Sequence, residues 1–290
     1  MRSAILMQNI DLHNHSRVSD GVLTPSELVV LAADNSVAGV ALTDHDDLAG
    51  LGEARQAAAL QRIGFVAGVE ISVTWDGKTL HVVGLGVDET NLALQQGLAQ
   101  LRQGRHERAL KMAGDLARAG VAGAWEGARS HAQHSAILTR THFARFLVER
   151  GMARDVSSVF KRFLVKGKPG YVAHRWAGLA EALAWILGAG GVAVLAHPGR
   201  YAMNPREMER LLGEFSDLGG RGIEVSTANH SQEERERFAG LARYYGLLAS
   251  RGADYHGPGE SRCEPGRIPL LPMGLTPVWE DERLRDQLII

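Results

Sequence analysis

Two histidines separated by one residue lie near the amino terminus, in the stretch DLHNHSRVSDG at residues 11–21. In an extended segment the side chains at positions i and i+2 point to the same face, so His13 and His15 are expected to direct their imidazoles at one point. Neutral imidazole is the commonest metal ligand in proteins. The spacing therefore predicts part of a metal site, to which other segments must contribute.

Further histidines and carboxylates lie on the predicted strands or in the loops that follow them. Asp254 and His256 repeat the i, i+2 spacing at the end of the last strand. Because the carboxyl ends of parallel barrel strands meet at one face, these side chains are expected to converge there. The nine candidate ligands are His13, His15, Asp20, His45, Glu70, His81, His197, Asp254 and His256.

The chemistry of this set indicates which cations it suits. Imidazoles and carboxylates without thiolates are typical ligands of Mn²⁺, Fe²⁺ and Zn²⁺. Nine ligands are too many for one ion, so we expect two or three divalent ions, Mn²⁺ before Fe²⁺ or Zn²⁺, with open positions for water and substrate. Asp11 and Asp44 each precede a candidate histidine and point away from it in a strand. Each could orient a ligand by accepting its second N–H, or could serve the structure of the barrel rim.

Short apolar runs alternate with helical patterns along most of the chain, which predicts a parallel sheet built from βα units. About six or seven such units favour an α/β barrel. Asp76-Gly77 separates two of the runs and is a hairpin signal. Strands are expected at 9–13, 38–45, 65–75, 79–87, 191–199, 222–226 and 246–256.

The middle of the chain differs from the rest. Residues 92–165 lack a convincing strand and show helical patterns, of which the first ends at Gly120. We therefore expect two parts, a barrel formed by 1–99 and 167–290 and a helical insertion at 100–166 that caps the metal site. The many basic residues of the insertion are explained either by substrate binding or by an ordinary solvated helix face.

The composition limits the class of protein. The chain of 290 residues has a net charge of −1, so no basic field covers the surface to attract a long nucleic acid. The single cysteine, Cys263, excludes an internal disulfide and a Cys-rich zinc site. Gly188, Gly190 and Gly191 interrupt the apolar run at 179–196, which predicts a helix, a turn and a strand rather than a membrane span. We expect a soluble, cytoplasmic protein with no membrane or protein partner.

Taken together, six motifs resemble those of the polymerase and histidinol phosphatase (PHP) family: DLHNHSRVSDG, ALTDHDDLAG, GVEIS, LHVVGLG, VLAHPGR and GADYHG. The resemblance covers the chain except much of the insertion. It implies a distorted (β/α)7 barrel with a trinuclear metal centre. Ala253 replaces a serine that is frequent in the family, at a position that is not a ligand. The implied groups are His13, His15, Glu70 and Asp254 for one ion, Glu70, His81 and His197 for a second, and Asp20, His45 and His256 for a third.

The insertion resembles that of a bacterial branch of the family, which includes 3′,5′-nucleoside bisphosphate phosphatases and the 5′→3′ exoribonuclease RNase AM. Where the branch more often has G-R-P-H, Thr139 and Thr141 flank Arg140 here, and Arg140 and His142 are kept. The resemblance implies removal of the 3′-phosphate from nucleoside 3′,5′-bisphosphates such as pAp. The alternatives are a 5′→3′ exoribonuclease on short 5′-phosphorylated RNA, a histidinol phosphatase, and a metal-dependent module without activity.

Phosphate-ester hydrolysis at such a centre needs no side-chain nucleophile, because a metal-bound hydroxide serves at neutral pH. No catalytic residue beyond the ligands is therefore expected. Arginine presents planar donors that match phosphate. The substrate-binding candidates are Arg140, His142, Arg175, Arg200, His134, Lys168 and Tyr171, each of which could instead be a surface charge or a helix-end residue.

Overall fold

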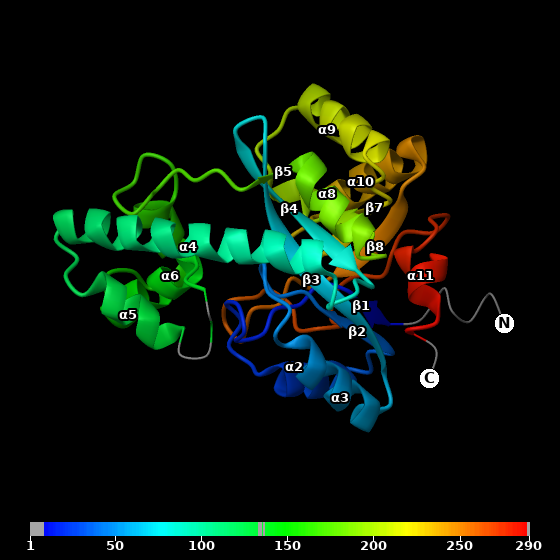
Figure 1. Ribbon diagram of the computed structural model, residues 1–290, viewed down its shortest axis with the longest axis horizontal. Helices are drawn as coiled ribbons and strands as arrows, with labels where there is room; N and C mark the ends of the chain where they lie inside the picture. Colours follow the sequence, from blue (N-terminus) through cyan, green and yellow to red (C-terminus); the bar gives the residue numbers. More distant parts are fainter. Residues whose placement is uncertain (1–8, 133–134, 136, 289–290) are drawn as a thin grey trace.

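The protein is described by a computed structural model that covers residues 9–132, 135 and 137–288 (Figure 1). One sheet follows the order β1-β2-β3-β4-β6-β7-β8, with β5 paired to β3. The strands are β1 (Ile10–Asp11), β2 (Gly39–Leu42), β3 (Gly64–Trp75), β4 (Lys78–Leu85), β5 (Ala177–Gly178), β6 (Val192–Leu195), β7 (Gly222–Thr227) and β8 (Leu248–Gly252).

The first and last strands lie side by side and close the sheet into a barrel. The backbone N–H of Leu12 donates to the carbonyl of Arg251 at 2.9 Å, and that of Asp254 donates to the carbonyl of His13 at 2.8 Å. Gly252 permits this approach, since a Cβ there would collide with His13. The predicted α/β barrel is confirmed, with the seven strands of the main path forming its wall.

One strand runs against the others and distorts the barrel. β4 pairs antiparallel with both β3 and β6, whereas the other pairs along the path are parallel. The predicted hairpin is confirmed: Asp76 and Gly77 have φ of 46° and 71°, as a two-residue type I′ turn requires. His81 pairs with Ser72 in the amino-terminal half of β4. It therefore reaches the site from the start of its strand, and the expectation that parallel strands present every ligand at their carboxyl ends is wrong for His81.

Helices cover the outside of the barrel (Figure 1). Their starts follow from local chemistry: the Thr24 side chain accepts from the backbone of Glu27, and the Glu27 carboxylate accepts from the backbone of Thr24. Among the described helices, none combines the length and the apolar character that a bilayer span needs. The outer helices are α2 (Pro25–Asp34), α3 (Leu51–Gln61), α8 (Leu179–Gly188), α9 (Pro205–Asp217), α10 (Gln232–Tyr245) and α11 (Glu282–Arg285).

A group of helices projects from one side of the barrel (Figure 1). The first half of α4 packs into the barrel core through Leu94 and Leu98, and its second half joins a separate apolar cluster through Met112 and Leu116. The boundary expected at residue 100 therefore falls inside a continuous helix, and the division into two domains stays a prediction. The group comprises α4 (Leu92–Arg118), α5 (Ala124–His131), α6 (Arg140–Glu149), α7 (Val156–Val159) and the π-helical turn η1 (Phe160–Leu164).

Candidate metal centre

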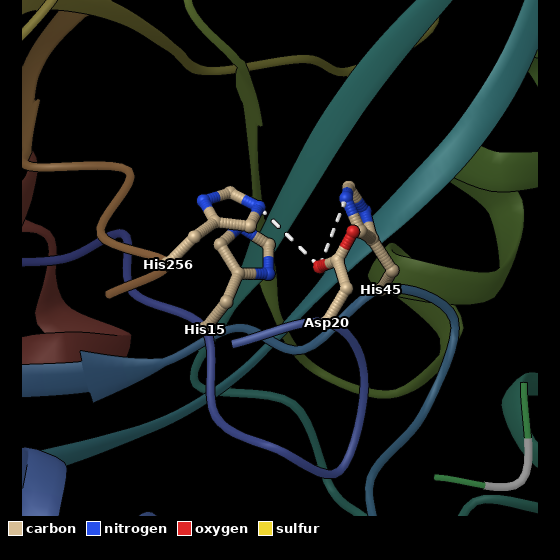
Figure 2. Close-up of side chains that lie close together, drawn as sticks. All are labelled: His15, Asp20, His45 and His256. Carbon is tan, nitrogen blue, oxygen red and sulfur yellow. Dashed lines mark ion pairs between the residues drawn. The ribbon is translucent and has the colours of Figure 1, made fainter. Parts of the chain in front are cut away.

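All nine predicted ligand residues come together at one end of the barrel. They form four overlapping groups, and within each group the candidate ligand atoms lie within 4.8 Å of one another. In Figure 2 the carboxylate of Asp20 lies between the rings of His45 and His256, with Oδ1 3.3 Å from Nε2 of His256. The groups are His15, Asp20, His45 and His256; His13, His15 and Asp254; His13, Glu70 and His197; and His45, Glu70 and His81.

Glu70 lies at the centre of the cluster and is fully buried. Its Oε1 is 2.8 Å from Nδ1 of His81 and 2.8 Å from Nε2 of His197. Its Oε2 is 2.8 Å from Nδ1 of His45. Burial opposes ionisation of Glu70, but the neighbouring charges of His81, His45 and His13 outweigh it and hold the pKa of the carboxyl well below its usual value. One carboxylate thus faces several imidazoles with both oxygens.

Several buried polar atoms of the cluster have no hydrogen-bond partner among the described residues. Among the described residues, Asp20 Oδ1, His45 Nδ1 and Glu70 Oε2 make no hydrogen bond; the last two are close but not aligned as donor and acceptor. Such atoms cost about 1–3 kcal/mol each when left unsatisfied. Nε2 of His13 and Nε2 of His15 also face each other at 3.1 Å. The orphaned atoms, the facing nitrogens and the N/O donor set fit divalent cations.

The backbone that carries the ligands is held in unusual conformations. His197 and Asp254 have φ of 27° and 52°, in the left-handed region that non-glycine residues rarely adopt. A parallel bridge joins His45 to Glu70, so the ends of β2 and β3 present these two side chains together. Strained positions of this kind persist where the surrounding structure imposes them, and they concentrate at functional sites.

Neither predicted orienting carboxylate contacts a histidine side chain in the described structure. Asp11 accepts hydrogen bonds from Asn14 and from the backbone N–H groups of Ala253 and Gly266. Asp44 accepts from the hydroxyls and backbone N–H groups of Ser16 and Ser19. Burial raises the pKa of Asp44 to about 6. The prediction that these residues orient a ligand is therefore wrong, and both brace the loops next to the site.

Glu224 on β7 makes the contact with a candidate ligand that was expected of those two residues. Its Oε1 lies 2.7 Å from Nδ1 of His13, and its Oε2 accepts the backbone N–H of His197. The side chain is 1% exposed. Sequence reasoning missed it, although an acid inside the apolar run GIEVS is a signal, because buried charges are rarely left unpaired.

A pocket opens directly over the cluster and is lined with arginines. Four guanidinium groups, those of Arg105, Arg108, Arg140 and Arg200, line it together with seven of the nine candidate ligands. Arg105 and Arg108 come from α4 and were not among the predicted residues. Burial lowers the pKa of Arg140, and the positive charges of Arg200 and Arg105 lower it further. Several positively charged guanidinium groups therefore lie close together along the pocket, in a group that we call the arginine wall (Arg105, Arg108, Arg140 and Arg200).

The other predicted substrate residues lie in different surroundings. Arg175 and Lys168 are exposed and, like Tyr171, do not line the pocket. His142 is buried in the cap of α6, where Nδ1 accepts the N–H of Thr139 at 3.1 Å, and burial lowers its pKa to about 3. A neutral, capping His142 does not support the cationic role expected for it. His134 lies outside the described residues.

Comparison with known proteins places this geometry in a family. The PHP domain model matches residues 11–228. The chain is 48% identical over 279 residues to a 3′,5′-nucleoside bisphosphate phosphatase of Chromobacterium violaceum, covering 96% of this chain and 98% of that one. It is 42% identical over 275 residues to the 5′-3′ exoribonuclease Rnm of Escherichia coli, covering 93% and 92%.

Two solved structures agree with this placement. An amidohydrolase from Chromobacterium violaceum with bound sulfate and no metal superposes with a TM-score of 0.93 at 48% identity, covering 97% of both chains. A protein from Bifidobacterium adolescentis, assigned as a metal-dependent phosphoesterase, superposes with a TM-score of 0.80 at 28% identity, covering 97% of this chain and 96% of that one. The chain belongs to the PHP domain family.

Proposed function

We propose that the protein is a metal-dependent phosphoesterase that removes the 3′-phosphate from nucleoside 3′,5′-bisphosphates such as pAp. One observation carries the proposal: the candidate metal ligands and a group of arginines line the same pocket. A nucleoside bisphosphate carries two phosphates, so one could lie at the metal ions while the arginines bind the other. The similarity to the bisphosphate phosphatase of Chromobacterium violaceum supports this choice of substrate.

The nine clustered residues would hold two or three divalent ions, for which we propose Mn²⁺, with Fe²⁺ or Zn²⁺ as alternatives. When bound, such ions lower the pKa of coordinated water and neutralise charge on the phosphate. Glu70, which faces imidazoles with both oxygens, would be among the residues that hold these ions. Glu224 holds the His13 ring so that Nε2 faces the cluster.

The arginines would bind the phosphate that is not hydrolysed. Within the described part of the chain, Arg108 and Arg140 form no ion pair with a carboxylate. Burial and the positive charges of Arg140 and Arg105 lower the pKa of Arg108, so a bound dianion would relieve the repulsion. Planar guanidinium groups bind phosphate through paired N–H donors. Arg200 lies closer to the metal ligands, with Nη1 2.6 Å from Oδ2 of Asp254.

A specific observation also favours the exoribonuclease as a second candidate. A second pocket adjoins the first and shares Arg200, Asp254 and His256 with it. It continues past Asn229 and Arg262, which gives room for more than one nucleotide. The similarity to Rnm of Escherichia coli is in line with an oligonucleotide substrate.

The test is hydrolysis of three substrates at equal concentration with Mn²⁺ present. It is followed as phosphate release from pAp and histidinol phosphate and as mononucleotide release from a 5′-phosphorylated trinucleotide. The proposal expects pAp to have the highest kcat/KM and adenosine 5′-monophosphate to be the product. Faster release of mononucleotides from the trinucleotide would favour the second candidate. Preference for histidinol phosphate, or no turnover of any of the three, would contradict both.

A further inference from the structure

Asp46 directly follows the candidate ligand His45 and is fully buried, yet it belongs to none of the metal groups. Its backbone has φ of 50°, and its N–H donates to the carbonyl of Glu70 at 3.0 Å. One carboxylate oxygen accepts the N–H of Ser72 at 2.9 Å. The backbone therefore fixes both the residue and the direction of its side chain, which points toward α4.

The other carboxylate oxygen of Asp46 binds an arginine of the pocket. Nε of Arg105 lies 2.6 Å from Oδ2 of Asp46, and Nη2 of Arg105 donates to the hydroxyl of Ser72 at 2.7 Å. The guanidinium also lies over the ring of Trp176, 4.8 Å from its centroid. Asp46, Arg105 and Ser72 thus form a closed ring of hydrogen bonds beneath the indole.

This arrangement leaves one edge of Arg105 free for a ligand. Nη1 has no hydrogen-bond acceptor among the described residues, and Arg105 lines the pocket over the metal cluster. A free arginine side chain loses rotamer entropy when it is fixed on a ligand. The ring removes most of that freedom before binding, which is what preorganisation requires.

We propose that Asp46 is a positioning residue for the substrate phosphate and acts through Arg105. Its carboxylate holds the guanidinium so that Nη1 points at an oxygen of the phosphate that the arginines bind. It also ties the loop after β2, which carries His45, to α4, so the ligand cluster and the arginine wall keep a fixed separation. The inference rests on the proposed function in that it requires a phosphate-bearing substrate.

The test is a double-mutant cycle of Asp46→Asn and Arg105→Gln, with KM and kcat measured for pAp and for p-nitrophenyl phosphate. Asp46→Asn is expected to raise KM for pAp about tenfold, with a smaller change in kcat and in p-nitrophenyl phosphate hydrolysis. In the Arg105→Gln background, Asp46→Asn should raise KM for pAp by less than about twofold. Manganese content and Tm are measured on every variant. In Asp46→Asn the manganese content should match the wild type, whereas Tm should fall because buried Arg105 loses its charge partner.

Arg102 offers a matched control, because it also ties α4 to residue 46. Its Nη1 donates to the backbone carbonyl of Asp46 at 2.8 Å, but it does not line the metal pocket. Arg102→Gln should therefore leave KM for pAp unchanged. If Asp46→Asn does not fold, Ser72→Ala removes the other anchor of Arg105 and should raise KM about threefold. An unchanged KM in the folded variant, or equal losses in both backgrounds, would overturn the proposal.

A failure of the proposed function is separable from a failure of this inference. If the wild type releases no phosphate from pAp, the same proteins are titrated with inorganic phosphate in a calorimeter. If Asp46→Asn binds phosphate about tenfold more weakly than the wild type, and the same change has no effect in the Arg105→Gln background, the positioning role would still be supported. Equal affinities, or no binding by the wild type, would overturn it.

Discussion

Glu224 and His13 lie 211 residues apart in the chain, and Oε1 of Glu224 is 2.7 Å from Nδ1 of His13. Because a carboxylate only accepts, Nδ1 must carry the hydrogen, which leaves Nε2 to face the cluster. Carboxylates that hold metal-binding histidines in this way typically contribute 10- to 100-fold to metal affinity. We therefore expect this contact to strengthen cation binding by His13.

The first prediction follows from this contact. Glu224→Gln should weaken Mn²⁺ binding by about 10- to 100-fold, because the amide holds the His13 ring less strongly. Calorimetric titration of the metal-free protein measures the effect. Glu214→Gln is the matched control, since Glu214 accepts a hydrogen bond from Trp75 away from the cluster. Equal affinities in wild type and Glu224→Gln would show that the contact is not needed for binding.

The second prediction concerns the arginine wall. Arg140→Ala removes a charge-assisted contact worth about 1.5–3 kcal/mol, which is roughly ten- to a hundredfold in kcat/KM for pAp. Hydrolysis of p-nitrophenyl phosphate, which has no second phosphate, should fall much less. Arg175→Ala, a change at an exposed position outside the pocket, serves as the control. Equal losses of kcat/KM on both substrates would mean that Arg140 contacts the reacting phosphate or stabilises the fold, rather than binding the second phosphate.

The third prediction concerns stability and pH. Asp281 accepts hydrogen bonds from the side chain and backbone of Arg283, which lower its pKa from 3.8 to about 2 although partial burial opposes this. A depressed carboxyl pKa contributes stability above the unfolded value, and that contribution is lost as pH falls through the folded value. Asp281→Asn should lower the free energy of unfolding at pH 7 by about 1–2 kcal/mol.

The difference between Asp281→Asn and the wild type should then shrink as pH falls from about 4 toward 2. Urea unfolding at a series of pH values measures it. A difference that stays constant over that range, or grows toward acid, would mean that the charge of Asp281 does not stabilise the fold.

The fourth prediction concerns the nucleophile. If water attacks phosphorus directly, hydrolysis in ¹⁸O-labelled water should place the label in the released phosphate within a single turnover. A substrate with chirally labelled phosphorus should show inversion, because one in-line displacement occurs. Retention of configuration would require a covalent intermediate on a side chain and would exclude this account.

Local sequence signals predicted the barrel and the clustering of the nine candidate ligands. The spacing of His13 and His15 placed two imidazoles on one face, and Asp76-Gly77 predicted the hairpin that the backbone adopts. These signals work because strand periodicity and turn chemistry depend on neighbouring residues alone. The reversed direction of β4 has no such signal, so the way in which His81 reaches the site could not be predicted.

Partners that are distant in the chain escaped sequence reasoning. Asp46 and Arg105 meet across 59 positions, and nothing in the pattern of α4 distinguishes Arg105 from the solvated basic residues around it. Asp11 and Asp44 were chosen because they neighbour histidines in sequence, but their side chains point to backbone and hydroxyl donors. Packing of the tertiary structure, which the periodicity does not encode, decides these contacts.

The central claim is that the nine-residue cluster binds divalent ions and that these ions support phosphate release. Elemental analysis of wild type and His13→Ala after Mn²⁺ reconstitution, combined with phosphate release from pAp on the same samples, tests it most directly. The account predicts about two or three ions per wild-type chain, fewer in a folded His13→Ala, and loss of activity with them. Less than about one ion per wild-type chain, or full activity after the metal is removed, would contradict it.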